Sequence, residues 1–363
     1  VDLESPEREH RLRGLTLDDP SRRLLHQLLS AHDSSDTHLL DQTLNRIAAD
    51  LVGEEQDGGG EIPEELNGER LGNWRVGEPI AHGAMAMVFH GERADDAYEQ
   101  HVAIKVLQPG RYRRAEGAQL QEELRLLALL EHPGIARLID GGVSEQGWPY
   151  LVMEYVDGLP IDRWCVEKAL DLGQRLRLVR KVCDAVRYAH GKLVVHADIK
   201  PSNVLVNGNG EVKLVDFGIA GLLRDDAEAD NKGVLLRCSP AYAAPEQLQG
   251  AAASTSHDVF GVGALLYELL TGQRIRDGRT ATELLLGRDS PDRIVPPSMR
   301  DAEIFPKSSL QGDLDAICMK ALAASPDDRY RTIERLRQDL DHHLHHRPVS
   351  ARAQTRSYTL SRW

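Results

Sequence analysis

Hydrophobic and polar positions alternate along three short stretches that follow residue 71. Residues 74–80, 86–92 and 101–107 each repeat with the period of two that is typical of β-strands. Residues 115–130 then show the longer period of a helix. Together these segments predict a small sheet that carries one helix.

The pattern changes after Tyr155, where helical periods dominate. Four segments, 173–190, 256–270, 314–323 and 332–345, repeat apolar positions at helical spacing. We therefore expect an α+β chain of two lobes, with the boundary near residues 154–158. No fixed internal repeat is present, which argues against solenoids and propellers.

The first 70 residues differ from the rest in composition. They are rich in Asp, Glu, Ser and Gly, with helical periods at residues 22–29 and 39–51, the second of which Asp36 or Thr37 can cap. Residues 53–60 contain four glycines among acidic residues and offer nothing apolar to bury. We interpret residues 1–70 as an acidic, partly helical extension and linker, which leaves open a binding partner for this segment.

Composition narrows the class of protein. Of the 363 residues, 41% are hydrophobic and 28% are charged, as in ordinary soluble proteins, and apolar runs such as 262–270 are too short to span a bilayer. The net charge of −13 argues against nucleic acid as a partner. Four widely spaced cysteines suggest neither a zinc site nor disulfides, so a reducing, cytoplasmic setting fits best.

A lysine at the end of the third predicted strand is the first candidate for chemistry. Lys105 closes the run Val102-Ala103-Ile104-Lys105, and a lysine on a rigid strand can direct one cation at a nucleotide phosphate. Glu123, on the helix that follows, has the spacing to pair with it. Glu122 is the neighbouring alternative, because helical geometry lets only one of the two face inward.

The segment His196-Ala197-Asp198-Ile199-Lys200-Pro201-Ser202-Asn203, followed by Asp216-Phe217-Gly218, resembles the protein kinase family. The resemblance implies a two-lobed kinase fold, ATP and two Mg²⁺ ions, with Mn²⁺ as an alternative. It implies that Asp198 orients the acceptor hydroxyl and accepts its proton, and that Lys200 contacts the transferred phosphate. Asn203 and Asp216 would hold the metal, and Lys105 and Glu123 would complete the catalytic set.

Further matches extend the resemblance over residues 74 to about 345. The run Met153-Glu154-Tyr155-Val156 resembles the hinge that meets adenine. The resemblance places the remaining nucleotide contacts at Ala81, Gly83, Val88, Ala103 and Leu205, although core packing explains the apolar ones equally well. Ala244-Pro245-Glu246, Arg329 and Asp258 resemble residues that support the site without taking part in the chemistry.

Two departures from the family pattern carry consequences. The glycine loop reads Ala81-His82-Gly83-Ala84-Met85-Ala86, and its lost glycines predict weaker ATP binding, because an alanine at positive φ costs about 1 kcal/mol. Ala197 stands where the catalytic loop usually has an arginine that receives an activation-loop phosphate. Residues 219–238 also contain no Ser, Thr or Tyr. We infer that phosphorylation within this stretch does not regulate the protein.

Lys200 and Ser239 favour Ser or Thr over Tyr as the acceptor in the protein substrate. The residues around the motifs resemble those of the bacterial branch of the family. We expect an N-lobe at 71–153, a hinge at 154–158 and a C-lobe at 159–345. Residues 346–363 form a basic tail that is either juxtamembrane, in a membrane-anchored full-length protein, or a trailing segment. The alternative to an active kinase is a nucleotide-binding pseudokinase that serves as a scaffold.

Overall fold

The computed structural model describes residues 66–82, 86–95, 99–107, 124, 126–217, 239–276, 294–300, 304–353, 355 and 358. The predicted helices at 22–29 and 39–51 lie outside these residues, as do Glu122, Glu123, Gly83 and the stretch 219–238. Of the helix predicted at 115–130, residues 124 and 126–130 are described; residues 124 and 126–128 are helical, whereas 129 and 130 are not.

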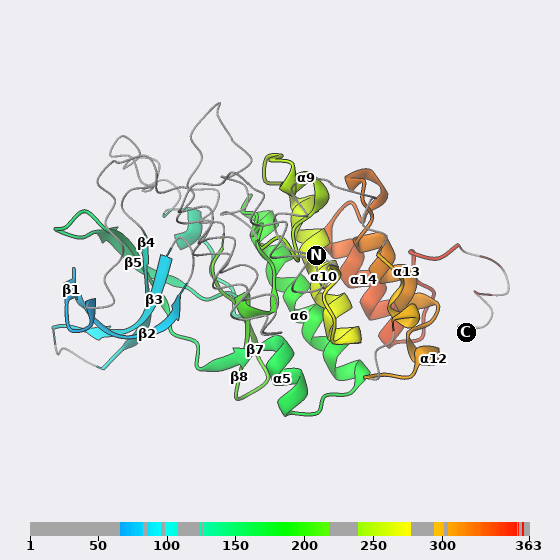
Figure 1. The fold of residues 1–363 in the computed structure, drawn as a ribbon, viewed down its shortest axis with the longest axis horizontal. Coiled ribbons are helices and arrows are strands. Elements are labelled where there is room, and N and C mark those ends of the chain that lie inside the picture. The colour runs from blue at the N-terminus through cyan, green and yellow to red at the C-terminus, as the bar shows by residue number, and fades with distance from the viewer. Residues whose placement is uncertain are drawn as a thin grey trace, which may run out of the picture. The chain divides into compact units, whose positions relative to one another are not determined.

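A six-stranded sheet forms the first lobe (Figure 1), with its strands in the order β1-β2-β3-β4-β6-β5. The strands are β1 Arg70–Leu71, β2 Trp74–His82, β3 Ala86–Arg93, β4 His101–Leu107, β5 Leu138–Val143 and β6 Pro149–Glu154. All neighbouring pairs are antiparallel. The three strands predicted from alternation are confirmed as β2, β3 and β4, within two residues at each end.

The two faces of this sheet separate packing from chemistry. Val102, Ile104 and Val106 on β4 are fully buried in one apolar cluster. Because side chains alternate along a strand, Ala103 and Lys105 project from the opposite face. That face looks toward the second lobe, and it carries the residues that the sequence assigns to the nucleotide.

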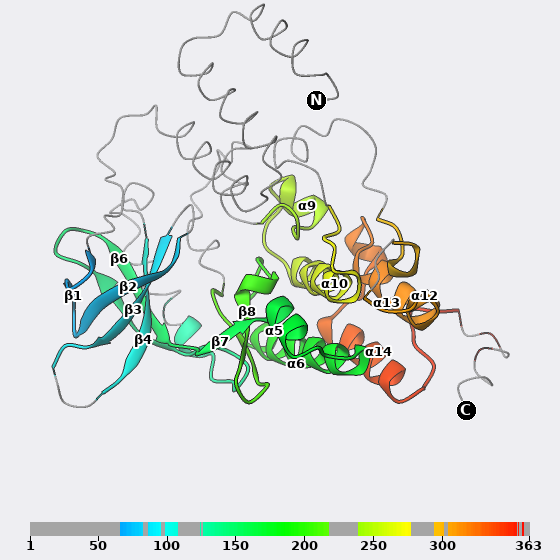
Figure 2. The same ribbon diagram turned by 60° about the horizontal axis from the view of Figure 1, so that its bottom comes forward.

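The second lobe is mainly helical, as Figures 1 and 2 show. Its helices are α5 Ile161–Glu167, α6 Leu172–Gly191, α9 Pro245–Leu248, α10 Thr255–Thr271, α12 Lys307–Leu310, α13 Asp313–Ala321 and α14 Ile333–Leu344, with short 3-10 turns η4 Pro201–Asn203, η5 Pro297–Met299 and η6 Pro326–Asp328. Helix α6 begins with a capping box between Asp171 and Gln174. Helix α10 is buried on nearly every side, and its neighbours α6, α13 and α14 pack around it. The four predicted helices are confirmed within two residues.

A small sheet of β7 Gly158–Pro160, β8 Val204–Asn207 and β9 Val212–Leu214 lies beside the stretch that connects the lobes. Residues 155–157 form that connection, inside the predicted boundary. A second link runs through the loop before β5, because Ala136 donates to the Leu214 carbonyl at 2.9 Å and Leu214 donates to that of Gly134 at 2.8 Å. The α+β, two-lobed fold predicted from the sequence is confirmed.

The described part of the C-terminal tail packs on the helical lobe. Val349 is fully buried and Tyr358 is 7% exposed. The Asp339 carboxylate, itself 2% exposed, accepts hydrogen bonds from the backbone and hydroxyl of Ser350 and from the Ala351 backbone. Packing therefore continues beyond residue 345. Within the described residues no helix is both long and apolar enough to cross a membrane.

Candidate active site

Asp198 lies at the centre of a set of hydrogen-bond donors. Its Oδ2 atom accepts from Lys200 Nζ at 2.8 Å and from Asn203 Nδ2 at 3.1 Å. Its Oδ1 atom accepts from the Ser239 backbone amide at 3.0 Å. A carboxylate has about four acceptor positions, so these donors leave one free, on Oδ1. An incoming hydroxyl group can therefore be held at that position.

The same donors keep Asp198 ionised. Burial raises the pKa of this carboxyl group and is the largest single effect, but the Lys200 ammonium, His196 and the Ser239 amide together outweigh it. The pKa of Asp198 consequently lies below its ordinary value. Lys200 also donates to Ser239 Oγ at 2.6 Å, so one cation connects the carboxylate to the hydroxyl that the sequence assigned to the acceptor side.

The backbone of this loop is held from two sides. Asp258, on α10, accepts from the amides of His196 at 2.9 Å and Ala197 at 2.7 Å. Ala197 has a φ of 63°, which is unfavourable for a residue with a Cβ. Gln247 fixes its other end by donating to the Ala197 carbonyl at 2.6 Å. These hydrogen bonds stabilise the strained backbone at Ala197 and thereby fix the position of Asp198, the next residue.

Lys105 pairs with Asp216 across the two lobes. The distance from Lys105 Nζ to Asp216 Oδ1 is 3.1 Å, and both side chains are partly buried. Glu123, predicted to pair with this lysine, lies outside the described residues. Asp216 has a φ of 60°, a conformation that turns its carboxylate out of the extended strand direction.

Asn203 and Asp216 have oxygens that suit a hard divalent cation. Asn203 uses its amide nitrogen to donate to the Asp198 carbonyl at 2.8 Å and to the Asp198 side chain. Among the described residues, the side-chain contacts of Asn203 use its Nδ2 atom and that of Asp216 uses its Oδ1 atom, which leaves Asn203 Oδ1 and Asp216 Oδ2 for another ligand. Amide and carboxylate oxygens are the ligands that Mg²⁺ prefers, so these two residues fit the metal implied by the sequence.

The residues assigned to the nucleotide come from both lobes and from the connection between them. On the sheet, Val88 lies opposite Lys105 and Ala103 opposite Met153, so the four side chains share one face. Ala81 lies opposite Val88 at the end of β2. Glu154 ends β6, Val156 lies in the connection, and Leu205 lies on β8 of the helical lobe. Met153 also borders an apolar hollow that ends at Asp216 and Phe217.

A buried ion pair holds the segment that follows the site. Arg329 donates to both oxygens of Glu246 at 2.6 and 2.7 Å, as the sequence resemblance implied. His257 Nε2 lies 3.5 Å from the same carboxylate and has no hydrogen-bond partner among the described residues. Burial lowers the pKa of His257, and Arg329 adds to this effect, although Glu246 and Asp258 oppose it. His257 is therefore neutral near pH 7.

This buried histidine predicts that the folded state loses stability in mild acid. In the unfolded chain His257 takes up a proton near its ordinary pKa of 6.5, whereas the folded state resists it. The unfolded state therefore binds more protons below about pH 6.5, and stability falls as the pH falls through that window. We expect the melting temperature to drop between pH 7 and pH 5, and to drop less steeply in His257→Gln. An equal slope in His257→Gln and in the exposed control His345→Gln would contradict this.

Three contacts of the site were not predicted from the sequence. Gln247 and its bond to Ala197 were not singled out, although this residue directly follows the Ala244-Pro245-Glu246 motif. The His257 ring was also missed. Lys213 pairs with the Glu154 carboxylate at 2.7 Å. The sequence pattern along β9 does not distinguish Lys213 from an ordinary surface lysine.

Comparison with known proteins adds independent evidence. Residues 74–341 match the family model described as "Protein kinase domain". The chain is 34% identical over 279 residues to the serine/threonine-protein kinase PknB of Mycolicibacterium smegmatis. This alignment covers 74% of the present chain and 42% of PknB. It is 33% identical over 299 residues to Pkn1 of Myxococcus xanthus, covering 80% and 41% of the two chains. The chain thus spans about two fifths of the length of these relatives.

The fold has counterparts among solved structures. The crystal structure of the Mycobacterium tuberculosis PknI kinase domain superposes with a TM-score of 0.55 at 22% identity. The match covers 76% of this chain and 98% of that domain. At this identity the likeness establishes the fold alone.

Proposed function

Because the chain belongs to the protein kinase family, with bacterial serine/threonine-protein kinases among its relatives, we propose that it transfers the γ-phosphate of ATP to a serine or threonine hydroxyl of a protein. One observation carries the proposal. Asp198 is held by Lys200, Asn203 and Ser239 with an acceptor position left over on Oδ1. That arrangement suits a hydroxyl nucleophile better than it suits a scaffold.

In the proposed reaction each of these side chains has a defined task. Asp198 accepts the hydrogen bond of the substrate hydroxyl and orients its oxygen toward the γ-phosphorus. It takes the proton as the new O–P bond forms and the bond to the β–γ bridging oxygen breaks, which releases ADP. Lys200, beside Asp198, offers its ammonium to the phosphoryl oxygens, which carry the negative charge of the transition state. Ser239, bonded to Lys200, lies at the acceptor side.

The nucleotide would be held by residues of both lobes. Lys105 contacts the α and β phosphates, and Glu123 is its proposed partner on the following helix. Adenine contacts the backbone of Glu154 and Val156, with Met153 closing the back of the pocket; Ala81, Gly83, Val88, Ala103 and Leu205 make up the remaining contacts. Asn203 and Asp216 would hold Mg²⁺, which would supply charge neutralisation at the phosphates.

We further propose that the activation segment is ordered without phosphorylation between residues 219 and 238. Support comes from the contacts at its C-terminal end. Ser239 binds Asp198 and Lys200, and Gln247 binds the Ala197 carbonyl. These three bonds connect the segment directly to the catalytic loop, where many kinases would need a phosphate and an arginine.

Ala197→Arg tests this regulatory proposal. The added guanidinium has no phosphate to receive, so we expect the initial rate of transfer to stay within about twofold of the parent's. Ala353→Arg, at an exposed position of the tail, adds the same charge elsewhere and serves as the control. A gain above about tenfold in Ala197→Arg alone would overturn the proposal.

The proposed activity is tested by incubating the chain with radiolabelled ATP, Mg²⁺ and a generic protein acceptor, followed by phosphoamino-acid analysis. Label on serine or threonine supports the proposal, and label on tyrosine contradicts the acceptor class. ATP binding without transfer would favour the alternative, a nucleotide-binding pseudokinase. The altered glycine loop and Ala197 are the two sequence features that support this alternative.

A further inference from the structure

An ion pair behind the connection between the lobes carries an inference beyond the reaction itself. Lys213 Nζ lies 2.7 Å from Glu154 Oε1, with 16% and 36% of the two side chains exposed. A second Lys–Glu pair, Lys168 with Glu167 in the helical lobe, is a surface contact in which about half of each side chain is exposed. The pair at Glu154 is therefore better shielded from solvent and salt.

The two partners come from the two walls of the expected adenine pocket. Glu154 is the last residue of β6, whose backbone the sequence assigns to adenine. Lys213 lies directly opposite Leu205 in the β8–β9 ribbon, and directly opposed residues project from the same face. The face of the ribbon that carries Leu205, the expected floor of the pocket, therefore also carries Lys213, which reaches Glu154.

The loop before β5 completes the connection. Arg137 donates its backbone amide to Glu154 Oε2 at 3.2 Å, and Glu154 donates its own amide to the Arg137 carbonyl at 2.8 Å. Two residues earlier, Ile135 bridges to Leu214, next to Lys213. Both carboxylate oxygens of Glu154 are thus engaged, one by each lobe.

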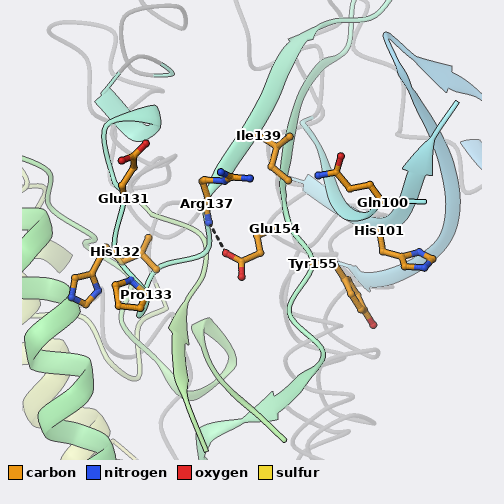
Figure 3. A pocket seen from close by; sticks show the side chains of 10 residues that line it. Gln100, His101, Glu131, His132, Pro133, Arg137, Ile139, Glu154 and Tyr155 are labelled. Carbon is orange, nitrogen blue, oxygen red and sulfur yellow. Dashed lines mark hydrogen bonds between the residues drawn. The ribbon is translucent and has the colours of Figure 1, made fainter. Parts of the chain in front are cut away.

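A cavity of about 620 Å³ is lined by Glu154 and Arg137 (Figure 3). Glu154 and Arg137 project into it between Tyr155 on one side and His132 and Pro133 on the other. Because the cavity leaves Glu154 without close packing on that side, shape alone does not fix its side chain. Its ion pair and hydrogen bond do so instead.

We propose that Lys213 is a positioning residue for the nucleotide: by holding the Glu154 carboxylate, it sets the distance between the hinge backbone and the Leu205 floor. The inference rests on the proposed function for the identity of the ligand. Lys213 does not contact the nucleotide or the reacting atoms. It acts on ATP binding in the ground state and in the transition state alike.

Lys213→Met removes the cation and keeps most of the apolar stem. We expect the Kd and KM for ATP to rise roughly tenfold while kcat stays within about twofold, the signature of lost uniform binding. Lys213→Arg, which keeps the charge, should recover most of the affinity. In Glu154→Gln the Kd should rise as well, and adding Lys213→Met to it should raise the Kd little further, because both changes break the same contact.

Lys168→Met is the matched control, since it breaks an exposed Lys–Glu pair in the same lobe. An unchanged or tighter Kd in Lys213→Met would overturn the inference, and so would a lower melting temperature with no change in Kd, which would mark the pair as structural. The Kd is measured directly by calorimetry with ATP and Mg²⁺, without any need for turnover. If the parent binds ATP but transfers no phosphate, the proposed function fails while a weaker Kd in Lys213→Met still supports this inference.

Discussion

Asp198→Asn is expected to lower phosphate transfer by roughly 10²–10⁴-fold, the usual contribution of a positioned general base. The asparagine can still accept the Ser239 amide, but its NH₂ group faces two donors, Lys200 and Asn203, where the carboxylate accepted both. It also has no lone pair basic enough to take the hydroxyl proton. The affinity for ATP should stay within about twofold, because no proposed nucleotide contact is removed.

Single-turnover transfer and calorimetric ATP binding, measured on the same preparation, separate the two effects. Asp341→Asn is a suitable control, since Asp341 pairs with Arg180 on the helical lobe and has no part in the proposed site. If Asp198→Asn transferred phosphate at the parent's rate, Asp198 would not be the base and the proposed mechanism would be wrong. A loss of transfer matched by a loss of folding would show up as a lower melting temperature.

The helices and strands of this fold could be predicted from the sequence because the spacing of apolar residues that indicates each of them lies within the segment itself. The alternation along residues 101–107 reports a strand with one buried face, and the structure buries Val102, Ile104 and Val106 as that pattern requires. The apolar run in α10 likewise reports a helix buried on nearly every side. The cluster of Asp198, Lys200 and Asn203 was accessible because these residues lie within six positions of one another.

The contacts that were missed join residues far apart in the chain. Lys213 and Glu154 are separated by 59 positions, and Gln247 and Ala197 by 50. A lysine on a strand or a glutamine at a helix start carries no local mark of its partner, because polar side chains at such places usually face solvent. Glu123 and Gly83 lie outside the described residues, so their assignments stay predictions.

The C-terminal tail also depends on partners that lie far away in the sequence. Its arginines by themselves predict a solvated or membrane-facing segment, because the acidic partner of the tail lies far away in the sequence. Arg352 pairs with Asp313 at 2.9 Å, across 39 positions, and its guanidinium lies over the Tyr358 ring. Two nearly fully buried aspartates, Asp313 and Asp339, thus accept donors from a tail that composition alone describes as exposed.

Removal of the tail after His345 should therefore lower stability strongly. Burying Val349 and Tyr358 contributes about 1.5–3 kcal/mol each, and the truncation also leaves Asp313 and Asp339 without these donors. A loss of this size corresponds to a fall of roughly 5–15 °C in melting temperature for a domain of this length. Scanning calorimetry of the parent and of residues 1–345, at one scan rate, measures it.

Two point variants distinguish docking from a general effect of shortening the chain. Tyr358→Phe keeps the ring but removes the hydroxyl that contacts Asp313 Oδ1 at 3.1 Å and accepts from the Val349 amide at 2.9 Å, so it should cost about 1–3 kcal/mol. Arg347→Ala removes an exposed side chain and should cost nearly nothing. A chain ending at residue 345 that melted within about 1 °C of the parent would contradict the docking. The family match ends at residue 341. A large loss of stability would instead extend the folded unit beyond the matched domain, to include the tail segment that contacts the buried carboxylates of Asp313 and Asp339.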